Sequence, residues 1–348
     1  MKILDAEATA AALGWPVLLA ALESTIDDAN AGRAACPPRM SVPLGKEAVW
    51  LLMPSFSRRA DIGACKLITV HADNRQRGLP AIQGDILVIR ASTGERLALL
   101  DGPTVTARRT AAVTGLAIRL IGAARSRRES ATAGAASAAG RAAFEPLPTN
   151  TEPSGVAPAS RHGTKDIPAT CLIIGCGVQG RSHLEALASI FPSLRFFLTS
   201  RTRKSAELLA AHANGSGIPA EDVSDAETAE AIAAADLIVC CTDASAVCLH
   251  RPPRDGAIIA AIGSFQPTMS ELAPAVMREI GRNILLDSAD AGHEAGELAL
   301  ARLDPEGLPN LFTWHPQLLP DVGRTVLFKS CGNALWDLAA AQAVVGAP

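Results

Sequence analysis

Three glycines with a distinctive spacing are the first candidates for chemistry in this chain. Residues 175–180 read Gly-Cys-Gly-Val-Gln-Gly and directly follow an apolar run at residues 172–174. In such a motif Gly175 permits a tight turn, Gly177 lets backbone amides approach a pyrophosphate, and Gly180 lets helix and strand pack closely. The helix that begins here supplies free N–H groups and a favourable dipole for phosphates. The motif predicts a dinucleotide site; an ordinary glycine turn is the alternative.

The type of dinucleotide depends on residues about 20 positions farther along the chain, at the end of the next strand. NAD-dependent enzymes place Asp or Glu there to accept a hydrogen bond from the ribose 2′-hydroxyl. Residues 199–204 contain no acid and offer hydroxyl and guanidinium groups instead, on Ser200, Arg201, Thr202 and Arg203. Hydrogen bonds from Arg to phosphate are charge-assisted and worth about 1.5–3 kcal/mol each. We therefore predict NADPH in preference to NADH, with NADH use still possible; an ordinary basic loop is the alternative.

Three cationic side chains lie on segments that otherwise look apolar. Lys66 interrupts the run at residues 64–68, Arg39 follows two prolines, and Arg109 lies in the first turn of an expected helix. A charged side chain in a buried strand is costly unless it is paired. Two interpretations stay open: the cations meet internal acids, or they converge on an anionic ligand such as a carboxylate. Three acids near another strand end either face the same site or serve as caps and solvated side chains: Asp287, Glu294 and Glu297.

The first third of the chain predicts a mixed layer of helices and strands. A helix is expected over residues 17–29, with Pro16 in its first turn and Gly32 at its end. The turn residues 92–95 predict a hairpin, which implies antiparallel pairing. A helix with one apolar face is expected over residues 106–124. Apolar runs without intervening helices predict strands at residues 48–53, 65–70, 85–89 and 96–100.

From residue 171 onward, short apolar runs alternate with helical segments. The runs lie at residues 171–174, 195–198, 237–240, 257–260 and 283–286. Continuous apolar runs of this length are typical of strands buried on both faces of a parallel sheet. Residues 333–345 predict an amphipathic helix that packs back on the first domain, and the connecting helices fit residues 182–190, 204–212 and 226–234. The predicted fold class is therefore α/β, with a doubly wound, Rossmann-type parallel sheet domain plus an α+β N-terminal domain.

Composition and charge argue against several classes of protein. The chain has 348 residues, 48% of them hydrophobic and 19% charged, with a formal net charge of −3. This balance lacks the basic surface that nucleic acid or anionic lipid would require, and we expect neither partner. No apolar run approaches the ~18 residues that span a bilayer, so we expect a cytoplasmic protein. The seven His and eight Cys residues show no metal-ligand or disulfide spacing, so we expect no metal.

Several stretches of the chain carry a further pattern. They are Pro38-Arg39, the strand around Lys66, Asp101-Gly102 followed by Thr-Ala-Arg-Arg-Thr-Ala-Ala at residues 106–112, the glycine motif, Ile-Gly-Ser at residues 262–264, and Phe-Lys-Ser-Cys-Gly at residues 328–332. Together these stretches resemble the ornithine cyclodeaminase/mu-crystallin family. The resemblance covers nearly the whole chain except residues 122–166, which are longer than the usual family connection.

The resemblance implies a division into domains. Residues 1–121 and 316–348 would form a substrate-binding and dimerisation domain, and residues 169–315 a Rossmann domain that binds NAD(P). Between them, residues 122–168 are rich in Ala, Ser, Gly, Thr and Pro, and we expect a flexible linker. Three basic side chains there are expected to be solvated: Arg125, Arg127 and Arg128. The family also implies a homodimer.

The resemblance implies roles for single residues as well. In relatives, the residues matching Arg39, Lys66 and Arg109 hold the substrate. Cys331 is expected to line the pocket, with a reactive nucleophile as the less favoured alternative. Cofactor contacts are implied for Val178, Gln179, Thr242 and Ser330, and the cofactor site is expected to include the neighbouring Ile262 and Gly263 as well.

One position departs from the cyclodeaminase pattern. Those enzymes carry a catalytic aspartate two residues after the glycine at position 263, where this chain has Phe265. Deamination of ornithine needs a carboxylate to deprotonate and position an ammonium group, which Phe cannot do. The chain is therefore similar to the reductase branch, the ketimine reductases, which reduce an existing cyclic imine. Bacterial members convert Δ1-pyrroline-2-carboxylate to L-proline and Δ1-piperideine-2-carboxylate to L-pipecolate.

For such an enzyme we expect Arg39 and Arg109 to clamp the carboxylate of the cyclic imino acid. Lys66 is the expected catalytic residue, either as proton donor or as electrostatic partner. Other functions stay open. An ornithine cyclodeaminase, or an amino-acid dehydrogenase acting on a 2-oxo acid and ammonia, would use the same clamp. A non-catalytic, NADPH-dependent binder of a small carboxylate belongs to a different class.

Overall fold

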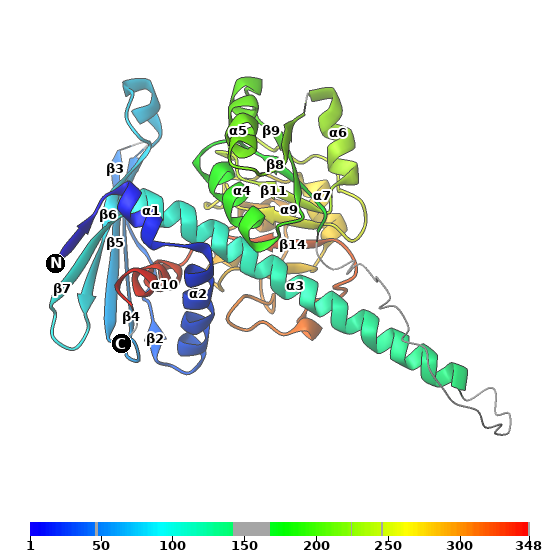
Figure 1. The fold of residues 1–348 in the computed structure, drawn as a ribbon, viewed down its shortest axis with the longest axis horizontal. Helices are drawn as coiled ribbons and strands as arrows, with labels where there is room; N and C mark the ends of the chain where they lie inside the picture. Colours follow the sequence, from blue (N-terminus) through cyan, green and yellow to red (C-terminus); the bar gives the residue numbers. More distant parts are fainter. Residues whose placement is uncertain (46–47, 142–167, 224, 245, 347–348) are drawn as a thin grey trace, which may run out of the picture.

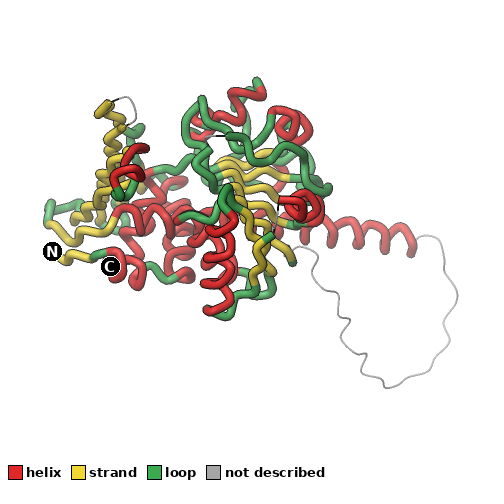
Figure 2. The backbone as a smooth tube through the Cα atoms, turned by 90° about the horizontal axis from the view of Figure 1, so that it is seen from above, coloured by secondary structure: helices red, strands yellow, loops and turns green. Residues whose placement is uncertain are grey.

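The chain folds around two seven-stranded sheets that stand side by side, each with its own helices (Figures 1 and 2). The structure is a computed structural model that describes residues 1–45, 48–141, 168–223, 225–244 and 246–346. The first sheet is mostly antiparallel and the second wholly parallel. This arrangement confirms the predicted fold class.

The N-terminal sheet has the strand order β1-β7-β6-β5-β4-β2, and β3 also pairs with β4. Its strands are β1 (Lys2–Leu4), β2 (Ala34–Ala35), β3 (Met40–Gly45), β4 (Ala48–Ser57), β5 (Ile62–His71), β6 (Ile82–Arg90) and β7 (Arg96–Asp101). The sequence pattern did not predict β1, which pairs with β7 in parallel. The expected hairpin between β6 and β7 is confirmed: the Arg90 N–H donates to the Glu95 carbonyl at 2.8 Å, and Gly94 has a φ of +74°.

Helices α1 (Ala6–Ala12), α2 (Trp15–Asn30) and α10 (Ala334–Val345) cover one face of this sheet (Figure 1). The C-terminal helix packs back on the first domain as predicted, against α2, β4 and β5. It is buried on all sides from Ala334 to Gln342 and is therefore not amphipathic, because the sheet and the other helices surround it. Among the described helices none by itself is long and apolar enough to cross a membrane; α1 and α2 meet that test only as a pair bent by 72°.

Helix α3 (Gly102–Arg141) joins the two halves of the molecule and corrects one expectation. The pattern predicted a helix over residues 106–124 and then a linker. The helix is instead 40 residues long in all, or about 60 Å, and ends at Arg141. It extends past the parallel sheet (Figures 1 and 2). Arg125 is half-buried and donates to the Val322 carbonyl at 2.8 Å, so it is less solvated than expected, whereas Arg128 pairs with Asp321 and its side chain stays 56% exposed. The rest of the expected linker, residues 142–167, lies outside the described residues.

The parallel sheet has the strand order β10-β9-β8-β11-β12-β14-β13. Its strands are β8 (Thr170–Ile174), β9 (Arg195–Thr199), β10 (Ala220–Asp222), β11 (Leu237–Cys240), β12 (Ile258–Ala261), β13 (Ile284–Leu286) and β14 (Val326–Lys329). The helices are α4 (Val178–Ile190), α5 (Arg203–Gly215), α6 (Asp225–Ala234), α7 (Pro274–Ile280), α8 (Ala291–Glu294) and α9 (Gly296–Ala301). The chain moves outward in both directions from the β8–β11 pair, which creates the crevice where such sheets bind ligands.

Strand β14 corrects the expected assignment of residues 316–348 to the N-terminal domain. It lies between β12 and β13 in the parallel sheet, so the chain returns to the first domain only with α10. The sequence pattern missed β14 because its short apolar run ends in Lys329, a residue type that is rarely buried without a partner. All four residues of the strand are nonetheless buried.

Candidate active site

The glycine motif lies at the carboxyl end of β8, beside the loop that follows β11. Gly175 has a φ of +108°, and a Cβ there would lie 2.6 Å from the Cys241 carbonyl oxygen. A Cβ at Gly180 would lie 2.1 Å from the Gly175 carbonyl oxygen, whereas a Cβ at Gly177 would meet nothing within 4 Å. The outer glycines thus allow the backbone to pack, and the middle one leaves open space at the start of α4. This geometry fits a pyrophosphate bound at a helix N-terminus.

The two residues after Gly177 are exposed differently. Val178 is 71% exposed at the mouth of the crevice. Gln179 is partly buried, and its Oε1 atom has no hydrogen-bond partner among the described residues. A buried carbonyl oxygen without a partner is costly, and a ligand that donates a hydrogen bond would satisfy it. Both residues therefore lie at the start of α4, directly after the glycine turn.

A buried acid that the sequence analysis missed, Glu271, organises the neighbouring loops. Its carboxylate accepts hydrogen bonds from the backbone N–H groups of Thr242 (2.7 Å), Ile262 (3.0 Å) and Gly263 (2.6 Å). It also accepts from the Thr242 hydroxyl at 2.8 Å. Burial raises the pKa of Glu271, while Lys329 and these donors act against that rise. Glu271 thereby holds three of the implied cofactor residues in one place.

The basic segment after β9 divides into two parts. Arg203 turns to its own helix and pairs with Glu207 at 3.1 Å and Asp222 at 3.4 Å. Arg201 is 75% exposed and lies 3.2 Å from Asp243, which follows β11. The sequence analysis did not consider Asp243. Arg201 is therefore the guanidinium group of this segment that borders the crevice. Ser200 is half-buried beside it, and Thr202 shares a hydrogen bond with Ser205.

The three cations meet on the side of the molecule nearest the N-terminal sheet. Lys66, on β5, is 2% exposed, and its Nζ lies 2.8 Å from Oδ2 of Asp337. Arg109, on α3, donates from Nε to Oδ1 of the same carboxylate at 3.1 Å. Burial, with Arg109 and Arg39 adding to its effect and Asp337 opposing it, lowers the pKa of Lys66 to about 8. Of the two interpretations left open, an internal acid is therefore present for Lys66 and Arg109.

Gly332 lies between the two arginines. Arg39 donates from Nη2 to the Gly332 carbonyl at 2.7 Å and to Oε2 of Glu294 at 2.7 Å. A Cβ at Gly332 would lie 2.9 Å from Nη2 of Arg109, and the φ of this residue is +85°. The chain thus brings Arg39, Lys66 and Arg109 into one cluster although they come from three separate segments. Local patterns carry no trace of Asp337, since its partners are hundreds of residues away.

The segment before Gly332 faces the parallel sheet. Asp287 accepts hydrogen bonds from the Ser330 hydroxyl and from the Gly332 N–H, each at 2.8 Å. Cys331 points its thiol at the Ser264 carbonyl, 3.7 Å away. Burial raises the pKa of Cys331 to about 12, so its thiol is not ionised near neutral pH and is a poor nucleophile. Ser330 and Cys331 therefore connect the cofactor loops with the cationic cluster.

Lys329 is a second buried cation, at the end of β14. Its Nζ donates to the Ser264 carbonyl at 2.7 Å and to the Ala261 carbonyl at 3.2 Å, and lies 3.5 Å from Glu297. These contacts join β14 to the loop that follows β12. Phe265, the residue in place of the cyclodeaminase aspartate, comes next in that loop and is half-buried. The loop therefore carries a half-buried apolar ring at the position where the resemblance implies the cyclodeaminase aspartate.

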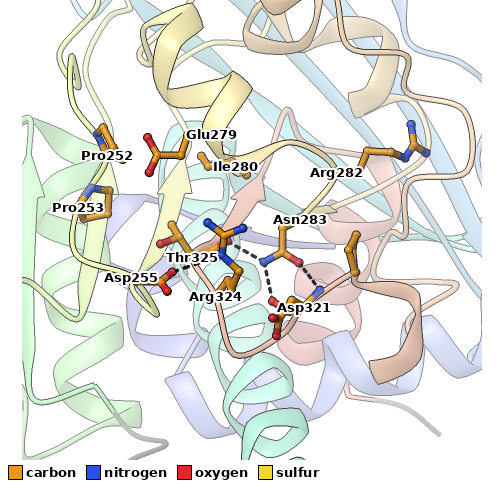
Figure 3. Close-up of a pocket in the computed structure, with 11 residues that line it drawn as sticks. Pro252, Pro253, Asp255, Glu279, Ile280, Arg282, Asn283, Asp321, Arg324 and Thr325 are labelled. Carbon is orange, nitrogen blue, oxygen red and sulfur yellow. Dashed lines mark hydrogen bonds and ion pairs between the residues drawn. The ribbon is translucent and has the colours of Figure 1, made fainter.

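The opposite, amino edge of the parallel sheet also has a cavity, of about 350 Å³ (Figure 3). Asn283 projects into it and donates to the carbonyl groups of Asp321 (2.8 Å) and Thr325 (2.7 Å). The side-chain amide of Asn283 thus finds its hydrogen-bond partners within the chain, and these bonds hold the loop that leads into β14. Ligands of parallel α/β sheets bind at the carboxyl edge. We therefore assign this cavity a structural role.

Comparison with known proteins agrees with this geometry. The profile of the ornithine cyclodeaminase/mu-crystallin family matches residues 3–143 and 154–346. The chain is 35% identical to Delta(1)-pyrroline-2-carboxylate/Delta(1)-piperideine-2-carboxylate reductase of Azospirillum brasilense, over 98% of this chain and 94% of that protein. It is 33% identical to Delta(1)-pyrroline-2-carboxylate reductase 1 of Burkholderia multivorans, over 98% and 94%.

A solved structure has the same fold. Delta(1)-pyrroline-2-carboxylate reductase of Thermococcus litoralis, in complex with NADH and L-proline, superposes with a TM-score of 0.78 at 21% identity. The match covers 99% of this chain and 96% of that one. The fold, the glycine motif and the match along nearly the whole sequence all lead to one assignment: the chain belongs to the ornithine cyclodeaminase/mu-crystallin family.

Proposed function

We propose that this protein reduces cyclic imino acids with NADPH, converting Δ1-pyrroline-2-carboxylate to L-proline and Δ1-piperideine-2-carboxylate to L-pipecolate. The observation that carries the proposal is that Arg39 and Arg109 lie against Gly332, two residues from Ser330 on the cofactor side, while Lys66 shares the Asp337 carboxylate with Arg109. The relatives from A. brasilense and B. multivorans are named as reductases of such substrates. The chain is an oxidoreductase of the same class.

The cationic cluster suits a planar ring with a C=N bond beside a carboxylate. Arg39 and Arg109 would hold the carboxylate and so fix which face of the ring is turned to the cofactor crevice. A reduced nicotinamide bound there supplies the hydride for C2 of the ring. Such clamps position the reacting atoms and thereby lower the activation barrier by several kcal/mol. Lys66 lies behind Arg109 and, with a pKa of about 8, supports the carboxylate or passes a proton toward the ring nitrogen.

Phe265 supports the reductase activity over cyclodeamination. A cyclodeaminase must bind and deprotonate an ammonium group, for which it needs a carboxylate near the ring. Phe265 offers an apolar surface that suits the methylene groups of a ring that is already closed. An open-chain 2-oxo acid with ammonia would leave this apolar surface uncovered. The cyclic imine is therefore the substrate that matches both the charged and the apolar parts of the site.

The preference for NADPH is supported by Arg201. Its exposed guanidinium group lies at the end of β9, where an enzyme specific for NAD carries an acid. The T. litoralis structure contains NADH, so relatives with this fold are able to bind the nucleotide that lacks the 2′-phosphate. Asp243 pairs with Arg201 at 3.2 Å and reduces its net charge. We therefore expect a preference for NADPH and measurable use of NADH.

We further infer a homodimer that forms through the uncovered face of the N-terminal sheet. Apolar side chains on this face are only half-buried, whereas their neighbours on the other face form the core with the helices. An apolar sheet face of this kind is typical of an interface between copies of a chain. All eight cysteines are free thiols, which favours a reducing compartment such as the cytoplasm. The half-buried residues of the uncovered sheet face are Leu52, Phe56, Leu67, Leu87, Ile89 and Leu99.

The proposed activity is tested by mixing the purified protein with NADPH or NADH and each imino acid. We expect loss of the reduced cofactor's absorbance with both rings, faster with NADPH. Arg109→Ala should raise KM strongly and leave NADPH binding nearly unchanged. Formation of proline from ornithine would instead indicate a cyclodeaminase, and turnover of pyruvate with ammonia an amino-acid dehydrogenase. Binding without any turnover would indicate a non-catalytic carboxylate binder.

A further inference from the structure

Glu294 occupies the guanidinium group that the substrate is expected to use. It is the last residue of α8, its side chain is 23% exposed, and its Oε2 lies 2.7 Å from Nη2 of Arg39. The same Nη2 donates to the Gly332 carbonyl at 2.7 Å. Arg39 is thus held by an acid of the chain itself. An anionic ligand can pair with Arg39 only if Glu294 shares it or moves away.

The charges around Glu294 keep its two protonation states close in energy. Arg39, from the segment before β3, and Lys329, on β14, favour the carboxylate, while Asp287 and Asp290, from the segment between β13 and α8, disfavour it. His293, the residue before Glu294, is exposed. Burial is the largest influence and raises the pKa of Glu294 to about 7. Near neutral pH this group therefore exchanges between a carboxylate paired with Arg39 and a neutral acid.

We propose that the substrate carboxylate displaces Glu294 from Arg39, and that Glu294 then takes up a proton and passes it to the ring nitrogen. The inference rests on the proposed function. In this step the O–H bond of Glu294 breaks and the nitrogen lone pair forms the new N–H bond, which gives an iminium. Hydride addition at C2 moves the C=N electron pair to nitrogen, and the reduced nicotinamide is oxidised. Glu294 is left as a carboxylate and pairs again with Arg39 when the product leaves.

Charge complementarity favours Glu294 over Lys66 as the donor. An iminium that forms beside Lys66 and Arg109 would add a positive charge to a site that already holds cations. A carboxylate left behind on Glu294 would instead attract the iminium. Lys66 is also fixed to Asp337 at 2.8 Å and is almost fully buried, whereas Glu294 is partly exposed and able to regain its proton from water. Glu294 therefore satisfies both the charge and the proton supply of the reaction.

The test uses pyrrole-2-carboxylate, a planar ring acid that cannot accept hydride and does not titrate near neutral pH. We expect its affinity for the wild-type protein saturated with cofactor to fall about tenfold per pH unit above pH ~7, with uptake of about one proton per ligand bound. Calorimetry in buffers of different ionisation enthalpy measures that uptake. In Glu294→Gln, affinity should no longer depend on pH around pH 7 and the uptake there should vanish, so that only a dependence near pH 8, where Lys66 titrates, remains.

Turnover gives the second readout. Removal of a general acid lowers kcat by about 10²–10⁴-fold, so Glu294→Gln should lose kcat and its pH dependence without a rise in KM at pH 8.5. Glu294→Asp should retain proton uptake at a shifted pH, which provides a variant if Glu294→Gln does not fold. Glu279→Gln, an exposed change at the amino edge of the parallel sheet, should behave as wild type.

The outcomes separate the two proposals. A wild-type protein that turns over no cyclic imine would overturn the proposed function, whatever the variants do. A wild-type protein that reduces the imines, together with a Glu294→Gln variant that keeps the wild-type pH dependence of binding and kcat, would overturn the role of Glu294 alone. Loss of kcat with unchanged proton uptake would likewise contradict the exchange with the substrate carboxylate.

Discussion

The cofactor crevice and the cationic cluster lie next to each other but are built by different means. In the crevice the backbone forms the binding surface, because the glycines let amide groups approach the open space. Glu271 fixes the neighbouring loops through hydrogen bonds from the N–H groups of Thr242 and Gly263. In the cluster the side chains form the surface, and Lys66, Arg109 and Arg39 each depend on a carboxylate from a distant segment. The first region is sensitive to added volume and the second to changed charge.

This difference indicates which features of a site can be inferred from local sequence. A backbone site leaves a short motif with fixed spacing, since the glycines must follow one another on a strand, a turn and a helix. A site made of paired charges leaves only isolated residues, because the partners meet in space and not in the chain. Substitutions that change volume or charge by a small amount therefore separate the two regions.

The largest effect is expected from Asp337→Asn. This change leaves Lys66 and Arg109 buried beside a neutral group, and removal of one partner of a buried ion pair costs about 3–5 kcal/mol. Unfolding by denaturant at pH 7 measures the loss. The loss should shrink at pH 9, because Lys66, with a pKa of about 8, can then release its proton. Asp255→Asn, an exposed acid 3.7 Å from Arg324, is the control and should leave stability unchanged.

His183 lies where α3 meets α4 and predicts a pH dependence. Its Nδ1 is 2.8 Å from the Gln179 carbonyl and its Nε2 is 3.0 Å from the Thr114 hydroxyl, so the ring connects α4 with α3. Burial lowers the pKa of His183 to about 4. The folded protein thus favours the neutral ring more than the unfolded chain does. The contribution of His183 to the free energy of unfolding is therefore fully present above pH 6.5 and is lost as pH falls toward 4.

The loss from His183 should reach about 3 kcal/mol between pH 6.5 and pH 4. The free energy of unfolding is measured across this range for wild type and for His183→Gln, and the difference between the two curves isolates this residue from the acids that titrate lower. Parallel curves would show that the ring is not held neutral in the folded state.

Glycine substitutions probe the crevice. Gly180→Ala places a Cβ 2.1 Å from the Gly175 carbonyl oxygen, and overpacking of this kind costs about 1–3 kcal/mol. We expect a lower Tm and weaker binding of the dinucleotide. Gly177→Ala, with nothing within 4 Å of the new Cβ, should keep the wild-type Tm and weaken only the dinucleotide. Equal loss of Tm in both variants would contradict the distinction between the outer and middle glycines.

Arg201→Ala should have the smallest effect, because the side chain is 75% exposed and shared with Asp243. We expect KM for NADPH to rise about tenfold, equivalent to about 1.4 kcal/mol, and KM for NADH to change little. Arg203→Ala is the matched control, since Arg203 is engaged with Glu207 and Asp222. An equal rise for both nucleotides would show that Arg201 does not contact the 2′-phosphate.

Sequence patterns were sufficient for the parallel sheet around β8 and β11 and for the glycine turn, because each is encoded by residues that are neighbours in the chain. They underestimated α3. Residues 122–141 were interpreted from their low content of large apolar side chains, although Ala is the strongest helix former and the segment is rich in it. Strand β14 was missed because its buried Lys329 is satisfied by Ser264, which lies on another loop.

The acids of the site could not be inferred in the same way. Asp337 occupies a buried position of α10 at which an apolar residue would be expected. Only its contact with Lys66 and Arg109 explains a buried carboxylate there. Glu294 was one of three acids near a strand end, and nothing in the sequence distinguished it from Asp287 or Glu297. Their partners come from segments that only the folded chain brings together.

The position of Gly332 has a mechanical consequence. The chain crosses from β14 to α10 through this residue, and both Arg39 and Arg109 lie against it. A rotation of one half of the molecule against the other would act on the backbone both at this crossing and at α3, and a turn at Gly332 would draw the two guanidinium groups away from their shared support. Movement of the backbone at Gly332 and release of a carboxylate held by Arg39 and Arg109 would then be mechanically coupled.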